Sequence, residues 1–266
     1  MAEESKQPDD PEPALHGHDP LTDSAGQPWA GRHFEPVAYD GDDGSAPAAI
    51  VDAIAQFRAG AIGAGEVLEA LRGERLLVPL VARLGEGGDG AHGLRTDKSA
   101  ELSIVTVRGP DERTVLPAFT SMAAMTRWNA NARPIPVQAE RVALAAAAEG
   151  TDLVVLDPLS DTEFALRRPG VWALGNGSRW LPAPEDPSVL AALEYATQGE
   201  PDIRRFEVLD GDPEARLIAP EIVVRLTLRE GLDAAAVSEL LARLSARWSL
   251  SELISERVDS MMVRLA

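Results

Sequence analysis

The chain has no cysteine, few aromatic residues and only four histidines among its 266 residues. The missing cysteine excludes disulfide bonds, thiolate nucleophiles, iron–sulfur clusters and cysteine-ligated zinc. His16 and His18 form a close pair, but no carboxylate or further histidine is spaced to complete a rigid ligand set. His33 and His92 stand in unlike segments, where we expect exposed side chains rather than general bases. We therefore expect neither a metal site nor a cofactor.

The chain also lacks long apolar runs and an excess of positive charge. No uncharged apolar stretch approaches the roughly 20 residues that cross a bilayer, and the acidic start has no features of a secretory signal. The 43 acidic residues outnumber the 25 Lys and Arg, for a net charge of -18. This charge repels nucleic acids and anionic membranes, and the pairs Arg167–Arg168 and Arg204–Arg205 are expected at solvated strand or loop ends. We expect a cytoplasmic protein with no nucleic-acid or membrane partner.

The first 46 residues differ in composition from the rest of the chain. Up to about Pro47 there are eleven Asp or Glu against one Lys and one Arg, about half of the net charge of the whole chain. Prolines, glycines and few large apolar residues leave too little apolar area to offset the entropy of ordering. Residues 1–46 are therefore predicted to be a disordered acidic tail, in which the aromatic residues of WAGRHFEPVAY are expected to dock on the folded part, with a partner protein as the alternative.

Residues 47–199 carry helix and strand patterns that predict one mixed domain. Apolar residues recur at helical spacing in 47–60, 63–73, 121–128, 140–150 and 187–198. Strands are expected in 75–84, 101–109, 114–120, 133–139 and 151–158. Pro79 indicates a sheet edge or a bulge, and GPDE at 109–112 is expected to join two strands of an antiparallel meander. The glycine-rich segment 85–93 lacks the spacing of a phosphate-binding loop and is predicted to be a hairpin loop.

Residues 200–266 predict a second, smaller domain. Apolar and polar residues alternate in EIVVRLTL, as in a sheet with one covered face. The next segment has an apolar helical stripe, with Asp233 placed to cap its first turn, and strands are expected at RRFEVLD and MMVRLA. The predicted fold class is α+β: two mixed α/β-layer domains with largely antiparallel sheets, preceded by the disordered acidic tail.

The hydroxyl pair Thr120–Ser121 stands where a strand is followed by a helix. Either side chain is suited to cap that helix, and a helix N-terminus also attracts anions through its first backbone amides. The candidate ligand site therefore comprises Thr120, Ser121, Met122 and Ala123, for a carboxylate or phosphate group. The G-x-S-x-G elbow is absent and no histidine follows His92, so we assign no catalytic residue.

Three segments occur in a fixed order, LLVPLV, then VLPAFTSMAAMTRW, then RPIPVQAERVALAAAAEGTDLVVLDP. This set resembles the N-terminal domain of the SseB family, the enhanced serine sensitivity proteins of bacteria, over about residues 48–197. The most specific element is the hydrophobic-Pro-x-Phe-Thr-Ser stretch followed by a helix with a tryptophan. In the family the later strand commonly ends in Asn-Pro, where this chain has Asp157–Pro158. The C-terminal strand–helix–strand segment is similar to the second domain of the family.

The resemblance implies a bacterial protein from a family without established catalytic residues. We expect a cytoplasmic, non-enzymatic protein-binding or regulatory protein whose partner is another protein or a second copy of itself. The alternative is a small-anion-binding protein or enzyme that uses the helix N-terminus at Thr120–Ser121. The acidic tail also permits a chaperone or effector role linked to secretion.

Overall fold

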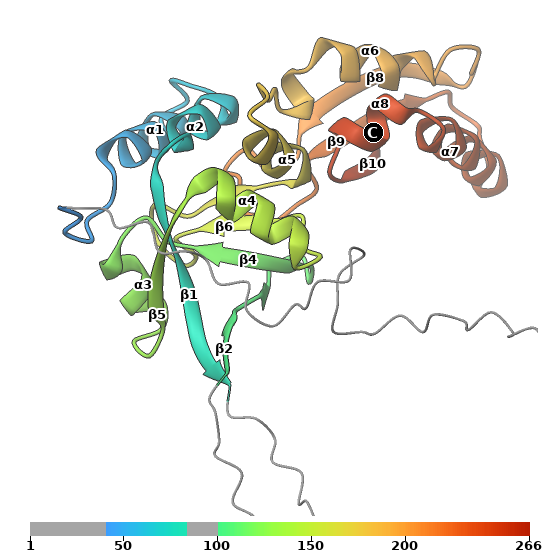
Figure 1. Ribbon diagram of the computed structural model, residues 1–266. Coiled ribbons are helices and arrows are strands. Elements are labelled where there is room, and N and C mark those ends of the chain that lie inside the picture. Colours follow the sequence, from blue (N-terminus) through green and yellow to red (C-terminus); the bar gives the residue numbers. More distant parts are fainter. Residues whose placement is uncertain (1–40, 84–100) are drawn as a thin grey trace, which may run out of the picture. The chain divides into compact units, whose positions relative to one another are not determined.

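The computed structural model describes residues 41–83 and 101–266 of the chain (Figure 1). Most of the predicted tail, the glycine-rich loop and all four histidines lie outside these residues. The helices are α1 (Ala48–Arg58), α2 (Ala64–Leu71), α3 (Met122–Trp128), α4 (Ala139–Ala148), α5 (Arg168–Asn176), the 3-10 helix η1 (Ala183–Glu185), α6 (Pro187–Tyr195), α7 (Ala234–Ser249) and α8 (Glu252–Arg257). None of the helices in this part of the chain has the length and apolarity needed to span a membrane.

The strands in the described residues form three small sheets. They are β1 (Arg75–Arg83), β2 (Glu101–Ile104), β3 (Val107–Arg108), β4 (Thr114–Ala118), β5 (Arg133–Gln138), β6 (Val154–Leu156), β7 (Phe164–Leu166), β8 (Ile203–Asp210), β9 (Ile222–Leu228) and β10 (Met261–Leu265). The sheet orders are β2-β1-β5, β3-β4-β6-β7 and β10-β9-β8. Only β4–β6 and β9–β10 pair in parallel; the other five pairs are antiparallel. The predicted α+β class with largely antiparallel sheets is confirmed.

The edge position predicted for Pro79 is wrong, because β1 is the central strand of its sheet. Pro79 lies opposite Pro134 of β5, and Leu77 lies opposite Pro136. The backbone N–H and C=O of Leu77 bond instead to Phe119, on the other side of β1. In an antiparallel strand, successive residues direct their backbone N–H and C=O groups to opposite neighbouring strands. Pro79, Pro134 and Pro136 stand at positions whose backbone groups point away from the β1–β5 pairing, so their missing N–H groups leave no hydrogen bond of this pair unmade. Pairing with β2 begins only at Leu80, one residue after Pro79.

The strand predicted over 101–109 is divided between two sheets. Its first part, β2, pairs with β1, and its second part, β3, pairs with β4. The predicted turn at GPDE is confirmed: the Gly109 amide donates to the Arg113 carbonyl at 2.8 Å. The antiparallel meander is thus limited to β3 and β4. The first sheet contacts the end of β4 through a backbone bridge between Leu77 and Phe119.

The helix ends follow the sequence signals closely. Gly73 and Gly150 have φ angles of 73° and 68°, in the left-handed region that a side chain disfavours, and they stop α2 and α4 as predicted. The cap predicted at Asp233 is also confirmed, since its carboxylate accepts a hydrogen bond of 2.8 Å from the Ala236 amide. Helix α4 packs against β1, β4 and α5.

The C-terminal sheet has its helices on one face (Figure 1). Ile222, Val224 and Leu226 of β9 are fully buried there, which confirms the predicted alternation, although Val223 on the opposite face is also largely covered. One apolar cluster joins these residues to side chains of α6, α7 and α8. The Trp248 indole of α7 donates to the Leu193 carbonyl of α6 at 3.1 Å. Helix α6 thus shares its core with the C-terminal sheet, and the domain boundary near residue 200 stays a prediction.

Candidate functional site

The predicted site at the start of α3 is held by bonds within the chain. Ser121 is the N-cap, and its hydroxyl accepts from the Ala124 amide at 3.1 Å, so the capping role is confirmed. The Met122 amide, expected to face an anion together with that of Ala123, donates to the Gly44 carbonyl at 2.9 Å. Thr120 is buried beneath this turn. An anion at this position would compete with Gly44 for the Met122 amide, and its binding at these four residues stays a prediction.

Asp157 is the buried partner of Thr120. Its carboxylate accepts from the Thr120 amide at 2.8 Å, the Thr120 hydroxyl at 2.6 Å and the Thr162 hydroxyl at 2.8 Å. The contact arises because β4 and β6 are parallel neighbours, so that their C-terminal ends meet. The arrangement anchors the turn after β6 to the start of α3, with the carboxylate acting as an acceptor for three donors.

Arg167 is buried, so the solvated position expected for the Arg167–Arg168 pair is wrong for this residue. Its guanidinium donates to Asp212 at 2.6 Å and to Asp259 at 3.0 Å. Asp259 also accepts two hydrogen bonds, of 2.9 and 2.8 Å, from Arg113. Arg113 and Arg167 belong to the region predicted as the first domain, and both aspartates belong to the C-terminal part. This ion-pair network therefore joins the two parts, through residues far apart in the sequence.

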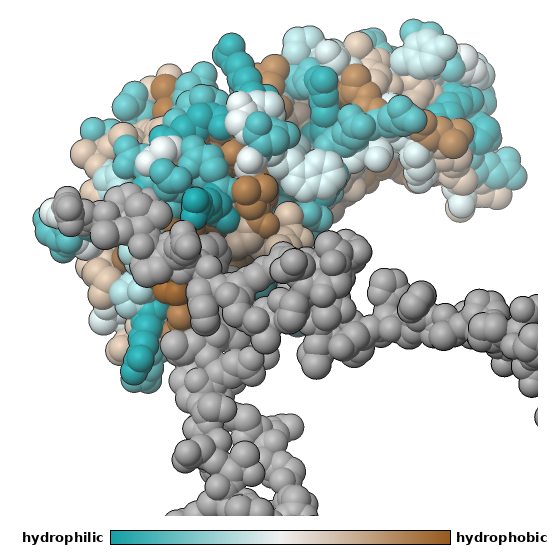
Figure 2. All heavy atoms as spheres, viewed as in Figure 1, coloured by the Kyte–Doolittle hydropathy of each residue, from teal (hydrophilic) through white to brown (hydrophobic). Residues whose placement is uncertain are grey.

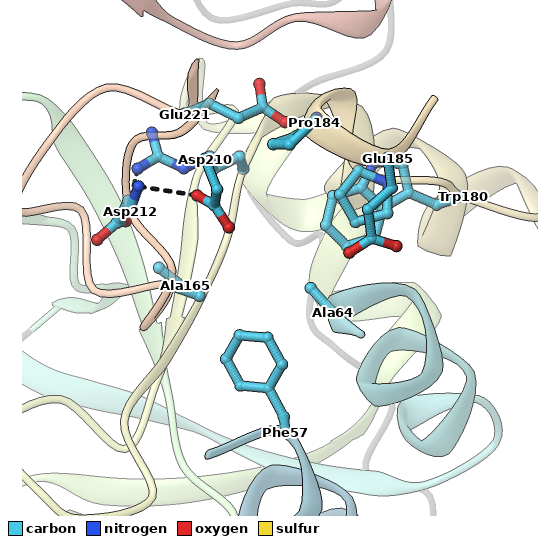
Figure 3. Close-up of a pocket in the computed structure, with 12 residues that line it drawn as sticks. Phe57, Ala64, Ala165, Trp180, Pro184, Glu185, Asp210, Asp212 and Glu221 are labelled. Atoms are coloured by element: carbon cyan, nitrogen blue, oxygen red, sulfur yellow. Dashed lines mark hydrogen bonds and ion pairs between the residues drawn. The ribbon is translucent and has the colours of Figure 1, made fainter. Parts of the chain in front are cut away.

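An acid-lined cavity lies beside this network (Figure 3). Its defining residues are Phe57, Trp180, Glu185, Asp210, Asp212 and Glu221. Trp180 and Glu185 lie on one side, Asp210 and Asp212 on the opposite side, and the Phe57 ring below the space between them. The cavity comprises about 450 Å³, including the part open to solvent. The sequence did not indicate this site, because its residues come from α1, η1, the segments before η1 and β9, and the end of β8.

Partial burial raises the pKa of three carboxyl groups in the cavity. Burial raises the pKa of Glu221 to about 7, although the Asp259 amide and the Arg167 guanidinium favour the charged form. Burial also raises the pKa of Glu185 and of Asp210, which lie at the mouth of the cavity. Glu185, Asp210 and Glu221 thus hold a proton more tightly than ordinary carboxyl groups.

A second hollow lies among α6, α7 and α8 and has a mainly apolar wall. Its residues, called here the α6–α8 surface, are Ala192, Tyr195, Ala196, Gln198, Arg247, Leu250 and Ser251. Tyr195 is 72% exposed and Leu250 is 84% exposed, high values for large side chains with apolar surface. Arg247 is held in place by a 2.8 Å bond to the Ala196 carbonyl and an ion pair with Glu200.

Among residues 41–83 and 101–266, no group of three or more His, Asp or Glu side chains is placed to hold a metal ion. The pair His16 and His18 lies outside these residues, as do His33 and His92.

Residues 50–173 match the family model described as SseB protein N-terminal domain. No curated protein and no solved structure gives a significant match. The matched region falls inside the range of about 48–197 over which the sequence resembles this domain, and it ends within α5. The assignment of residues 200–266 to a C-terminal SseB-like domain stays a prediction.

Proposed function

We propose that the protein, whose residues 50–173 match the SseB protein N-terminal domain, is a regulatory protein that acts by binding another protein. A second copy of the chain is the alternative partner. The observation that carries this proposal is the α6–α8 surface, where Tyr195 and Leu250 remain exposed around an apolar hollow. We place the activity in the cytoplasm, because its reducing conditions suit a chain that forms no disulfide bond.

The chemistry of the α6–α8 surface suits a protein partner. Tyrosine is enriched at interface hot spots, since its ring contributes a large apolar area and its hydroxyl a hydrogen bond. Full burial of a leucine side chain contributes about 1.5–3 kcal/mol, and most of that area of Leu250 is still exposed. Arg247, fixed by Glu200 and the Ala196 carbonyl, places a positive charge beside these two residues.

The extent of exposed apolar surface supports a regulated rather than a permanent complex. On the face shown in Figure 2, hydrophobic residues occur as small groups separated by hydrophilic ones. Permanent complexes bury larger and more apolar interfaces than transient ones. The α6–α8 surface fits a partner that associates and dissociates.

The substitution Leu250→Asp tests this proposal. We expect tagged full-length protein to recover a specific partner from a native lysate of the source cells, as identified by mass spectrometry, and the variant to lose it. The native mass of the purified protein shows whether that partner is a second copy. Ile218→Asp is the matched control, because Ile218 is 70% exposed and lies outside the α6–α8 surface. Equal recovery by both variants would contradict the assignment of this surface.

A shortened version that begins at Gly41 separates binding by the acidic tail from binding by the folded part. Deletion up to Pro47 would also remove two contacts of the folded part. These are the 2.6 Å ion pair between Asp42 and Arg75 and the bond from the Met122 amide to the Gly44 carbonyl. We expect the version that begins at Gly41 to keep the partner. Its loss would show that the tail carries the interaction instead.

A further inference from the structure

Two polar atoms at the acid-lined cavity are buried without a hydrogen-bond partner among the described residues, Oδ1 of Asp212 and Nε1 of Trp180. Asp212 is 6% exposed and Trp180 is 9% exposed, and both side chains line the cavity. A buried polar group without a partner is costly, and most such groups in folded proteins are bonded to protein or water. Asp212 has an acceptor and Trp180 a donor available, so a molecule that satisfies both needs one donor and one acceptor.

The charges around the cavity favour a positive occupant. Among the described residues that line the cavity, Glu185, Asp210, Asp212 and Glu221 contribute carboxyl groups, and Arg167 is the one basic side chain. Its two terminal nitrogens already donate to Asp212, Asp259, Ser260 and the Ala219 carbonyl. Arg167 is thus engaged by the chain itself, and an anion entering the cavity would meet carboxyl groups instead. A cation would compensate the charge that partial burial makes costly.

The walls favour an organic cation over a metal ion. Phe57 and Trp180 line the cavity together with Pro182 and Pro184, and aromatic rings attract ammonium groups. The Phe57 ring already has the Arg58 guanidinium 5.6 Å from its centroid, so this ring interacts with a cation in the chain itself. The described carboxylates do not come together in a group that would hold a metal. Much of the 450 Å³ is open to solvent or too narrow for a molecule, and water-sized groups can be centred in about 50 Å³ of it. On the same measure one water molecule requires about 10–15 Å³. The cavity therefore has room for a few small groups, the size of a short amine.

We propose that the acid-lined cavity binds a small organic ammonium ion that also carries an oxygen acceptor, as in an amino alcohol. The ammonium group bonds to Asp212 and is held by the carboxylate of Asp210, while the oxygen accepts from the Trp180 indole. The side chains of Phe57 and Trp180 lie beside the short hydrocarbon segment. The cavity is separate from the α6–α8 surface, and this proposal does not depend on the protein partner.

Ethanolamine hydrochloride is the probe that tests this site, in the full-length protein at about pH 8. The indole N–H signal of Trp180 in a ¹⁵N NMR spectrum is identified by its absence in Trp180→Phe. We expect this signal to shift and saturate with a dissociation constant in the millimolar range, as suits so small a ligand. Equal concentrations of ethylene glycol and of sodium chloride serve as neutral and ionic controls, and neither is expected to reproduce the saturable shift.

Asp210→Asn removes one charge at the mouth while keeping an oxygen that can accept from the Asp212 amide, as Asp210 does at 2.9 Å. We expect roughly ten-fold weaker ethanolamine binding, and Glu185→Gln is a second variant should the first fail to fold. Asp161→Asn, at an exposed position outside the cavity, is the matched control and keeps the affinity. An unshifted Trp180 signal would overturn the proposal. An equal response to ethylene glycol or sodium chloride would also overturn it, since it would indicate a cavity that holds water only. Undiminished ethanolamine binding by the folded charge-removal variant would overturn it as well.

Discussion

Asp157 occupies an unusual position for a carboxylate, buried and with a left-handed backbone. Its φ angle is 43°, in a region that Asp and Asn tolerate better than most residues because their short side chains bond locally. The three donors of Thr120 and Thr162 surround it. An Asn at this position would tolerate the same backbone, and its single carbonyl oxygen would replace only part of the acceptor capacity of the carboxylate.

We predict that Asp157→Ala lowers the free energy of unfolding by about 2–4 kcal/mol, because the buried Thr120 amide loses its acceptor and the left-handed backbone its favourable side chain. Asp157→Asn is expected to cost roughly 1 kcal/mol, since its oxygen still accepts from that amide. Urea denaturation measures both, with the exposed Asp161→Ala as the control. Equal losses for the two Asp157 variants would show that its hydrogen bonds contribute little.

Glu221 is the residue whose ionisation is expected to affect stability near neutral pH. Its pKa of about 7 in the folded protein lies above the ordinary value of 4.5. Between these values the folded state binds the proton more tightly than the unfolded state, so the contribution of Glu221 to stability decreases as pH rises through this window. Complete ionisation costs on the order of 3 kcal/mol.

We predict that the unfolding free energy of Glu221→Gln, relative to the unmodified protein, increases as pH rises from about 5 to about 8. The glutamine does not ionise, and its oxygen still accepts from the Asp259 amide, which Glu221 bonds at 2.6 Å. Denaturation midpoints at several pH values measure the difference between the two curves. The exposed Glu194→Gln is the control and should give a parallel curve. Parallel curves for Glu221→Gln would mean that burial does not raise this pKa.

At the scale of single elements, sequence patterns were reliable because they arise within one segment. The apolar spacing in α1, α2 and α7, the glycine stops after α2 and α4 and the Asp233 cap all involve residues within a few positions of one another. The errors concern pairing between segments. Pro79 indicated a sheet edge, but the hydrogen-bonding side of a strand depends on its neighbours, and the prolines of β5 lie opposite β1. The division of 101–109 into β2 and β3 likewise depends on which sheet each half joins.

The candidate sites were even harder to predict from the sequence, because most of their contacts join residues far apart in the chain. The Ser121 cap was predictable, since its acceptor and donor are three residues apart. The Thr120–Asp157 contact spans 37 positions and required knowledge that β4 and β6 are parallel neighbours. The acid-lined cavity combines Phe57 with Trp180 and Glu221, and no local pattern relates these residues.

At the scale of the whole folded part, Arg167 links distant regions of the chain. Its guanidinium lies between Asp212 and Asp259, and all three side chains are almost fully buried. Removal of one partner from a buried ion pair leaves an uncompensated charge, which costs more than the loss of an exposed pair.

We predict that Arg167→Met lowers the free energy of unfolding by about 3–5 kcal/mol, since Asp212 loses its cation and Asp259 keeps only Arg113. Arg205→Met is the matched control, because Arg205 is exposed and its pair with Glu207 is expected to contribute less than about 1 kcal/mol. Urea denaturation of both full-length variants measures the difference. Similar losses would show that the buried network does not hold the two regions together.

Local sequence patterns were sufficient to predict the α+β class, the order of most helices and strands, and the resemblance to the SseB N-terminal domain, whereas β7, α5, η1 and α8 were not predicted. These properties follow from local periodicity, capping residues and short motifs, which act between residues close in the chain. The burial of Arg167, the bonds between Asp157 and Thr120, and the cavity surrounded by carboxyl groups from three regions become evident only from the three-dimensional arrangement. Each of these depends on which distant segments become neighbours, and burial and charge acquire their energetic effect only once the surrounding groups have excluded water.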